Sequence, residues 1–233
     1  MRFRIFFVFA LTFSFLDLQA QSENIKVMQY NLMYYKTSSA PCNHSVSSST
    51  RDQHLTDIVA YVAPDILLVN ELGTSPVNPL VMMRDVLNVQ GVSHFERAGN
   101  SNNSTSSLVN MLFYNKDKLT LKSQNRVDRD LNNTPIIRVI DFYRLYVNDS
   151  GLGTPGVDTV FINIGLAHLK AGNSSADQTQ RDRATAAVMA YIDQELAGEN
   201  VLFAGDFNVY RSSEAAFQNL INYSSNPSVS LND

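Results

Sequence analysis

VLFAGDFN, at residues 201–208, joins four apolar residues to a glycine and then places an aspartate and an asparagine two positions apart. The apolar run predicts a short buried strand that is interrupted at Gly205. Many α/β enzymes place their polar active-site groups at the carboxyl ends of such strands. We therefore expect Asp206 and Asn208 to lie at the edge of a sheet.

Two segments nearer the N-terminus repeat this pattern. Residues 25–30 and 66–69 are apolar-rich strand candidates, and the first runs into Asn31 while the second ends at Asn70 and Glu71. An amphipathic stretch between them predicts a helix that Thr50 could cap. The segment is thus expected to form a strand, helix, strand unit with a polar residue after each strand.

The remaining elements follow from similar patterns. We expect a second helix at 80–87, a hairpin of strands 109–114 and 119–122, longer strands at 136–147 and 157–166, a helix from Ser174 or Ser175 to Leu196, and a last helix at 213–221. A Gly-x-Gly-x-x-Gly match at 151–156 contains Pro155 and precedes a strand, so it predicts a turn instead of a dinucleotide site.

Polar side chains follow four of the predicted strands. They are Asn31, Glu71, His168, and the pair Asp206 and Asn208. Singly, each has an ordinary explanation, because polar residues often end strands. If the strands lie side by side, however, all five converge on one rim of the sheet.

The N-terminus has the features of an export signal. Arg2 and Arg4 precede an apolar run at residues 5–16 that is shorter than the roughly 20 residues of a membrane span. We expect cleavage near Ala20 or Gln21 and a mature chain that is secreted or periplasmic.

Composition indicates an ordinary globular chain. With residues 1–20 taken as the signal peptide, residues 21–233 suffice for one large domain without a membrane span. The formal net charge is -4, so the composition does not indicate a broad basic surface for nonspecific nucleic-acid binding. A local basic groove is still compatible with this charge. Cys42 is the one cysteine of the sequence, which excludes an intrachain disulfide.

Four motifs resemble those of the endonuclease/exonuclease/phosphatase superfamily, the DNase I-like phosphoesterases. They are QYN at 29–31, PDILLVNE at 64–71, AHLKAG at 167–172 and GDFN at 205–208. The resemblance implies an α/β (α+β) fold, a four-layer sandwich of two packed mixed β-sheets flanked by helices. It also implies metal-dependent hydrolysis of phosphodiesters or phosphomonoesters.

The resemblance assigns a role to each strand-end residue. Glu71 matches a metal-binding glutamate with Asn31 beside it, and Asp206 matches the residue that orients or deprotonates the attacking water. Asn208 donates to the phosphate or helps to hold a second ion, and His168 contacts a nonbridging phosphate oxygen. The implied metal ligands are Asn31, Glu71, Asp206 and Asn208, and the implied ion is Mg²⁺ or Mn²⁺, which prefer oxygen ligands.

The sequence departs from the family pattern near its end. Members carry a final Ser-Asp-His element, but no histidine follows His168 here, and Asp233 is the one aspartate after Asp206. We therefore expect a domain that is incomplete at its C-terminus, lacks its last strands and has little or no activity.

The expected partner is a phosphodiester substrate, with DNA or RNA as the first candidate, and no protein partner is evident. A lipid or inositol phosphate is the alternative within the enzyme class. An inactive fragment or extracellular binding module on the same fold is the alternative outside it.

Several arginines are candidates for surface roles. Arg97, Arg138 and Arg144 are expected to make local phosphate contacts, whereas Arg181 and Arg183 are expected to be solvated on the polar side of a helix.

Overall fold

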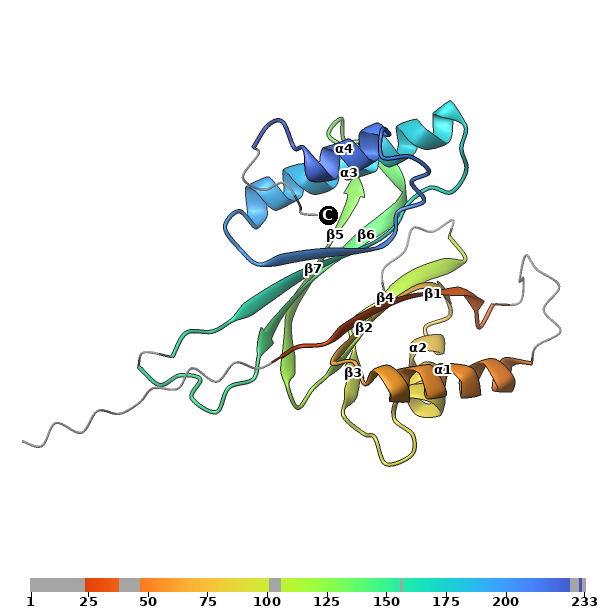
Figure 1. The fold of residues 1–233 in the computed structure, drawn as a ribbon, viewed down its shortest axis with the longest axis vertical. Coiled ribbons are helices and arrows are strands. Elements are labelled where there is room, and N and C mark those ends of the chain that lie inside the picture. Colours follow the sequence, from red (N-terminus) through yellow and green to blue (C-terminus); the bar gives the residue numbers. More distant parts are fainter. Residues whose placement is uncertain (1–23, 38–46, 101–105, 156, 227–230, 232–233) are drawn as a thin grey trace, which may run out of the picture.

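Two four-stranded β-sheets pack face to face in the computed structural model, and helices cover their outer faces (Figure 1). The structure describes residues 24–37, 47–100, 106–155, 157–226 and 231. The strand order is β1-β2-β4-β3 in the first sheet and β5-β6-β7-β8 in the second. The predicted four-layer sandwich is confirmed, and the expected signal peptide and Cys42 lie outside the described residues.

The elements follow one another in two groups along the chain. The first sheet and its helices comprise β1 (Val27–Tyr35), α1 (Ser48–Val62), β2 (Ile66–Gly73), α2 (Asn78–Met82), the π-helical turn η1 (Met83–Leu87), β3 (Phe95–Arg97) and β4 (Leu108–Asn115). The second sheet and its helices comprise β5 (Leu119–Arg129), β6 (Pro135–Val147), β7 (Phe161–His168), α3 (Ser175–Glu195), β8 (Val201–Asp206) and α4 (Ala215–Ile221).

Side-chain caps begin the two long helices. Ser47, and not Thr50, caps α1, because the Ser47 side chain accepts the Thr50 backbone N–H and the helix starts one turn earlier than expected. Ser174 caps α3 and forms a reciprocal capping box with Asp177. Among the described residues, no helix has the length and apolar character needed to cross a bilayer.

The predicted hairpin of β4 and β5 is wrong. β4 pairs with β2 on one side and β3 on the other, so both of its edges are occupied, and β5 instead pairs with β6. The turn at 115–118 therefore carries the chain from the first sheet to the second. The local pattern of two apolar runs around a polar turn cannot distinguish this crossing from a hairpin.

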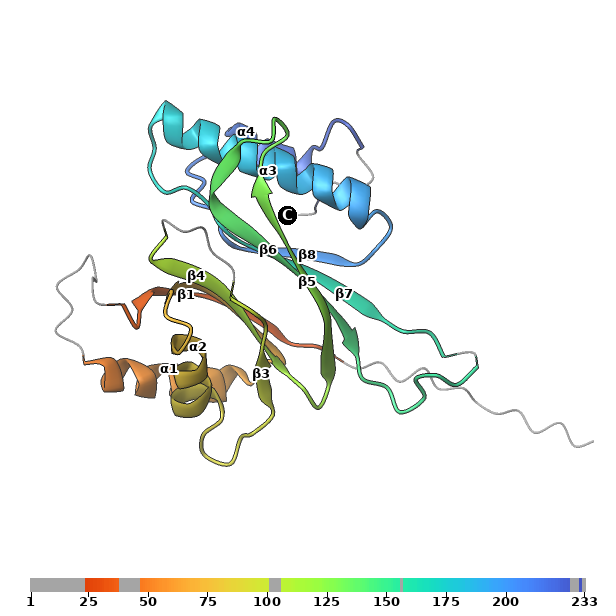
Figure 2. The same ribbon diagram turned by 180° about the vertical axis from the view of Figure 1, so that it is seen from behind.

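Apolar side chains fill three interfaces. One cluster lies between the sheets and includes Ile66, Leu68, Tyr143 and Ile164. The other two lie where α1, α2 and η1 cover the first sheet and where α3 and α4 cover the second, as the reverse view also shows (Figure 2). The central strands β2 and β4 are buried on both faces, which agrees with their nearly continuous apolar sequences.

Parallel pairing places the important strand ends together. β1 runs parallel to β2, and β7 runs parallel to β8. Their carboxyl ends, which carry the polar residues noted in the sequence, therefore meet within each sheet. Face-to-face packing then brings the two sets of strand ends to one rim of the sandwich.

Candidate active site

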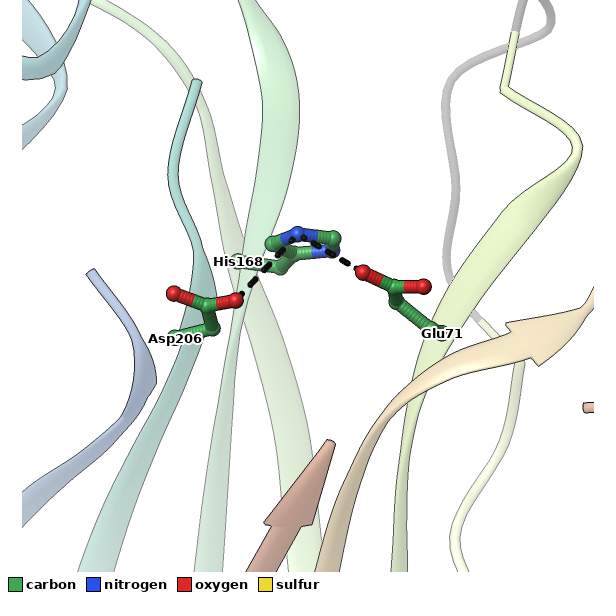
Figure 3. Close-up of side chains that lie close together, drawn as sticks. All are labelled: Glu71, His168 and Asp206. Atoms are coloured by element: carbon green, nitrogen blue, oxygen red, sulfur yellow. Dashed lines mark ion pairs between the residues drawn. The ribbon is translucent and has the colours of Figure 1, made fainter. Parts of the chain in front are cut away.

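Glu71, His168 and Asp206 converge at this rim from three strands of the two sheets (Figure 3). One ligand atom from each residue lies within 4.8 Å of the other two. His168 Nε2 is 3.6 Å from Glu71 Oε1 and 3.9 Å from Asp206 Oδ2. The imidazole therefore stands between two carboxylates that are far apart in the sequence.

A β-bulge places Glu71 at the rim. In β2, Ile66 and Leu68 face the other sheet while Leu67 and Val69 face the helices, so strict alternation would turn Glu71 toward the helices. Pairing with β4 skips from Val69 to Leu72, and Glu71 has a φ of 62°. The extra residue returns Leu72 to the helix side and frees Glu71 for the site.

Gly205 allows Asp206 to reach the opposite side of the site. Its φ is 137°, and a Cβ at this position would lie 1.9 Å from the carbonyl oxygen of Ala167. Only glycine therefore permits β8 to lie against β7 in this register, in which Asp206 is opposite His168.

Asn31 links the two carboxylates. Its Nδ2 donates to Glu71 Oε1 at 3.1 Å and to Asp206 Oδ2 at 2.9 Å, while its Oδ1 accepts the Met33 N–H. The Tyr34 N–H donates to Glu71 Oε2 at 3.0 Å. Both carboxylates are thus held by donors from the end of β1.

Asn208 holds Asp206 and the neighbouring loop. Its backbone N–H donates to Asp206 Oδ1 at 3.1 Å, and its Nδ2 donates to the Leu169 carbonyl at 3.0 Å. Its φ of 48° belongs to the left-handed region, which asparagine tolerates better than most residues. All five strand-end residues predicted from the sequence therefore lie at this rim, and Asn208 contacts its neighbours mainly as an orienting group.

His168 is neutral at neutral pH. Burial lowers its pKa to about 4, the nearby Arg138 acts in the same direction, and Asp206 opposes them. Its contacts in Figure 3 are therefore charged pairs only in acid, and at pH 7 the imidazole serves as a hydrogen-bond donor or a ligand.

Arg138 supplies positive charge beside the site. Its Nη1 donates to the Leu169 carbonyl at 2.8 Å. Burial lowers its pKa, and attraction to Glu71 and Asp206 opposes that shift. The two other arginines proposed for phosphate contacts bind elsewhere, because Arg97 donates to the Ala98 carbonyl and Arg144 pairs with Glu199.

The expectation that Arg181 and Arg183 are solvated is wrong. Arg181 is fully buried, donates through Nε and Nη2 to Glu214, and donates through Nη1 to the carbonyls of Lys170 and Gly172. Arg183 pairs with the largely buried Asp130.

Helical spacing carried a signal for the burial of Arg181. It precedes Ala184 and Val188 at intervals of three and seven on the buried face of α3. The Arg181–Glu214 pair fixes the loop after His168 to the segment after Asn208.

The donor set fits a hard divalent cation. The two carboxylates are ligand types that Mg²⁺ and Mn²⁺ accept, and the neutral imidazole adds a nitrogen. Asn31 turns Nδ2 toward both carboxylates and Oδ1 toward the Met33 N–H, so its oxygen would reach a cation only after the carboxamide rotates. The Glu71 and Asp206 side chains are 13% and 32% exposed, so the pair of negative charges is only partly hydrated. A cation would offset their mutual repulsion.

This fold and rim define a sandwich of the DNase I type with a candidate metal-binding centre. The chain matches the Endonuclease/Exonuclease/phosphatase family over residues 28–229 and belongs to that family. Its members are phosphoesterases, hydrolases of ester bonds that depend on divalent metals. None of the curated proteins matches the sequence.

Solved structures share the fold at low sequence identity. The human Nocturnin catalytic domain with bound sulfate is similar with a TM-score of 0.63 and 14% identity, over 85% of this chain and 69% of that one. A mannosyl-6-phosphatase from Bacteroides thetaiotaomicron has a TM-score of 0.53 and 15% identity, over 83% and 68%. TDP2 from D. rerio, complexed with a single-strand DNA product, has a TM-score of 0.51 and 12% identity, over 81% of this chain and 62% of that one.

Proposed function

We propose that this protein hydrolyses phosphodiesters with the help of Mg²⁺ or Mn²⁺, and that DNA or RNA is its first substrate class. One observation carries the proposal: Glu71, His168 and Asp206, from both sheets, lie within 4.8 Å of one another. Membership in a phosphoesterase family and the fold shared with a DNA-bound TDP2 support it.

The proposed mechanism assigns work to each side chain. Glu71 would hold the metal, joined by Asn31 once its carboxamide has rotated to present Oδ1, and the metal when bound supplies positive charge to a phosphate oxygen. Asp206 accepts a proton from the attacking water, and the Asn208 N–H on Oδ1 keeps that carboxylate oriented. Neutral His168 donates from Nε2 to a nonbridging oxygen, where negative charge spreads as the bond breaks.

Arg138 would supply a further cationic contact to the phosphate. It is partly buried beside two carboxylates and keeps guanidinium donors besides the one on Leu169. This assignment follows its place in the site and its chemistry. It predicts weaker substrate binding in Arg138→Met, with metal binding retained.

Metal binding and hydrolysis test the proposal together. Residues 24–233 should bind Mn²⁺, measured by electron paramagnetic resonance, and should cleave bis-p-nitrophenyl phosphate, plasmid DNA or RNA in an EDTA-sensitive manner. Glu71→Ala should lose both properties. Cleavage that persists in Glu71→Ala, or the absence of Mn²⁺ binding in the parent chain, would refute the assignment.

The same assay separates the alternatives when p-nitrophenyl phosphate, inositol phosphates and lipid phosphates are added as substrates. Preferred turnover of p-nitrophenyl phosphate would indicate a phosphomonoesterase, as the mannosyl-6-phosphatase is. Turnover of inositol or lipid phosphates would indicate the other enzyme class. Mn²⁺ binding without any turnover would favour a binding module on this fold.

We also propose export. Export follows from the basic and apolar residues at 2–16, and a product with Gln21 at its N-terminus in the secreted or periplasmic fraction would support it.

A further inference from the structure

Asn70, the residue before Glu71, lies between the two sheets and is fully buried. Its Oδ1 accepts the Gln29 Nε2–H at 2.8 Å and the Asp206 backbone N–H at 3.1 Å. Its Nδ2 donates to Asn110 Oδ1 at 2.8 Å and to the Ala167 carbonyl at 3.0 Å. The four bonds use the full hydrogen-bonding capacity of a carboxamide.

The backbone partners determine the orientation of this carboxamide. The Asp206 N–H can only donate and the Ala167 carbonyl can only accept, and neither can exchange roles by rotation. Oδ1 must therefore face Asp206 and Nδ2 must face Ala167. The orientation does not depend on the choice of side-chain rotamers around it.

These contacts join the two halves of the candidate site. Asn70 belongs to β2 of the first sheet, whereas Ala167 and Asp206 belong to β7 and β8 of the second. Asn70 is covalently next to Glu71, and Ala167 is covalently next to His168. The Asn70 side chain is therefore hydrogen-bonded to the backbone of Asp206 and of the residue before His168, and Asn70 itself precedes Glu71.

Asn31 links the two carboxylates at their tips, whereas Asn70 holds the backbones that carry them. Most other contacts between the sheets are made by apolar side chains, whose contacts are nondirectional and tolerate small shifts. Hydrogen bonds of 2.8–3.1 Å tolerate much less. Asn110 extends the polar contact across the interface by donating to the carbonyls of Val139 and Leu166 at 3.2 Å.

We propose that Asn70 is a positioning residue that fixes the distance between the Glu71 carboxylate on one sheet and the Asp206 carboxylate on the other. The proposal rests on the proposed metal-dependent function. It assigns Asn70 no contact with the metal or the substrate. Removal of its carboxamide should leave both carboxylates present but incorrectly spaced for a shared cation.

Asn70→Ala tests this role against Asn163→Ala. Asn163 is also a buried asparagine, 2% exposed, but it lies at the opposite end of β7 and binds Asn200 and Glu199. Both substitutions remove a buried carboxamide and should lower stability. Only Asn70→Ala should weaken Mn²⁺ binding, by about tenfold or more, which corresponds to the loss of roughly one hydrogen bond of positioning.

Amide hydrogen exchange in metal-free protein supplies a second measurement. The Asp206 N–H should exchange about tenfold faster in Asn70→Ala, because its acceptor is gone, and should be unchanged in Asn163→Ala. Equal Mn²⁺ affinity and equal Asp206 exchange in the two variants would overturn the proposal.

Gln29→Met decides the question if Asn70→Ala does not fold. Gln29 is only partly buried, and this change removes one of the four bonds while leaving the Asn70 side chain in place. Because the Asn70 Oδ1 acceptor remains in Gln29→Met, the expected acceleration of Asp206 exchange is smaller than in Asn70→Ala. Faster exchange together with weaker Mn²⁺ binding supports the proposal, and no change in either overturns it. If the parent chain binds no Mn²⁺, the proposed function fails, and the exchange measurement still decides whether Asn70 holds Asp206.

Discussion

Loss of the Arg181 guanidinium should destabilise the protein more than loss of any surface arginine. Arg181→Met would leave the Glu214 carboxylate, 5% exposed, without the guanidinium that donates twice to its Oε2. It would also leave the carbonyls of Lys170 and Gly172 without their donor. Removal of one partner from a buried ion pair costs about 3–5 kcal/mol.

Urea denaturation followed by circular dichroism measures this cost as a loss in the free energy of unfolding. Thermal denaturation measures it as a lower midpoint, and because each kcal/mol corresponds to about 2–4 °C in a domain of this size, the midpoint should fall by about 6–20 °C. Arg126→Met is a matched control, because the Arg126 pair with Asp128 is 54% and 42% exposed. The control should change the free energy of unfolding by at most about 1 kcal/mol.

The double variant Arg181→Met/Glu214→Leu separates charge from packing. It removes the uncompensated carboxylate but still leaves two backbone carbonyls without donors and the Tyr210 N–H without its Glu214 acceptor, so we expect an intermediate loss of about 1–3 kcal/mol. The reasoning is refuted if Arg181→Met costs less than about 1 kcal/mol, or if the double variant is no more stable than the single one.

Three further predictions follow from the site and its surroundings. Gly205→Ala should abolish Mn²⁺ binding in a calorimetric titration, since its Cβ would overlap the Ala167 carbonyl. The control Gly198→Ala, at a position with a φ of 78° and open space around it, should lower the free energy of unfolding by only about 1 kcal/mol. Glu71→Gln should remove the rise in thermal midpoint that Mn²⁺ gives the parent, in which binding adds about 2.7 kcal/mol to the free energy of unfolding at one hundred times Kd; a persistent rise would place the ion elsewhere. Hydrogen bonds from Lys170 and then Ser174 lower the pKa of Asp177 to about 2, so its stabilisation is complete at neutral pH and is lost as pH falls from about 4 toward 2. The stability difference between the parent and Asp177→Asn should shrink over that range in acid titrations of unfolding, and a constant difference would contradict the assignment.

The fold and the five rim residues were accessible from sequence because their signals are local. Apolar runs that end in a polar residue predict strand ends, and His168 and Asp206 are the last residues of β7 and β8, whereas β1 continues past Asn31 to Tyr35 and β2 continues past Glu71 to Gly73. The parallel pairing needed to bring Glu71 beside Asn31 follows from the intervening helix. The family resemblance supplied the arrangement of the two sheets, which the local patterns do not contain.

The missed features depend on contacts between distant segments. The partner of β5 is β6 and not β4, a choice that is made by which sheet edges are free. Arg181 was misassigned because its partner Glu214 lies on another element. Asn70 has an unremarkable sequence context, and its four partners come from β1, β4, β7 and β8.

The crossing at 115–118 divides the chain into two consecutive halves, one for each sheet. Glu71 is made with the first half, and His168 and Asp206 are made with the second. A chain emerging from synthesis therefore does not present the three groups together when only its first half has folded. Docking of the two sheets assembles the cluster, so any binding that needs all three side chains reports that the sheets have packed.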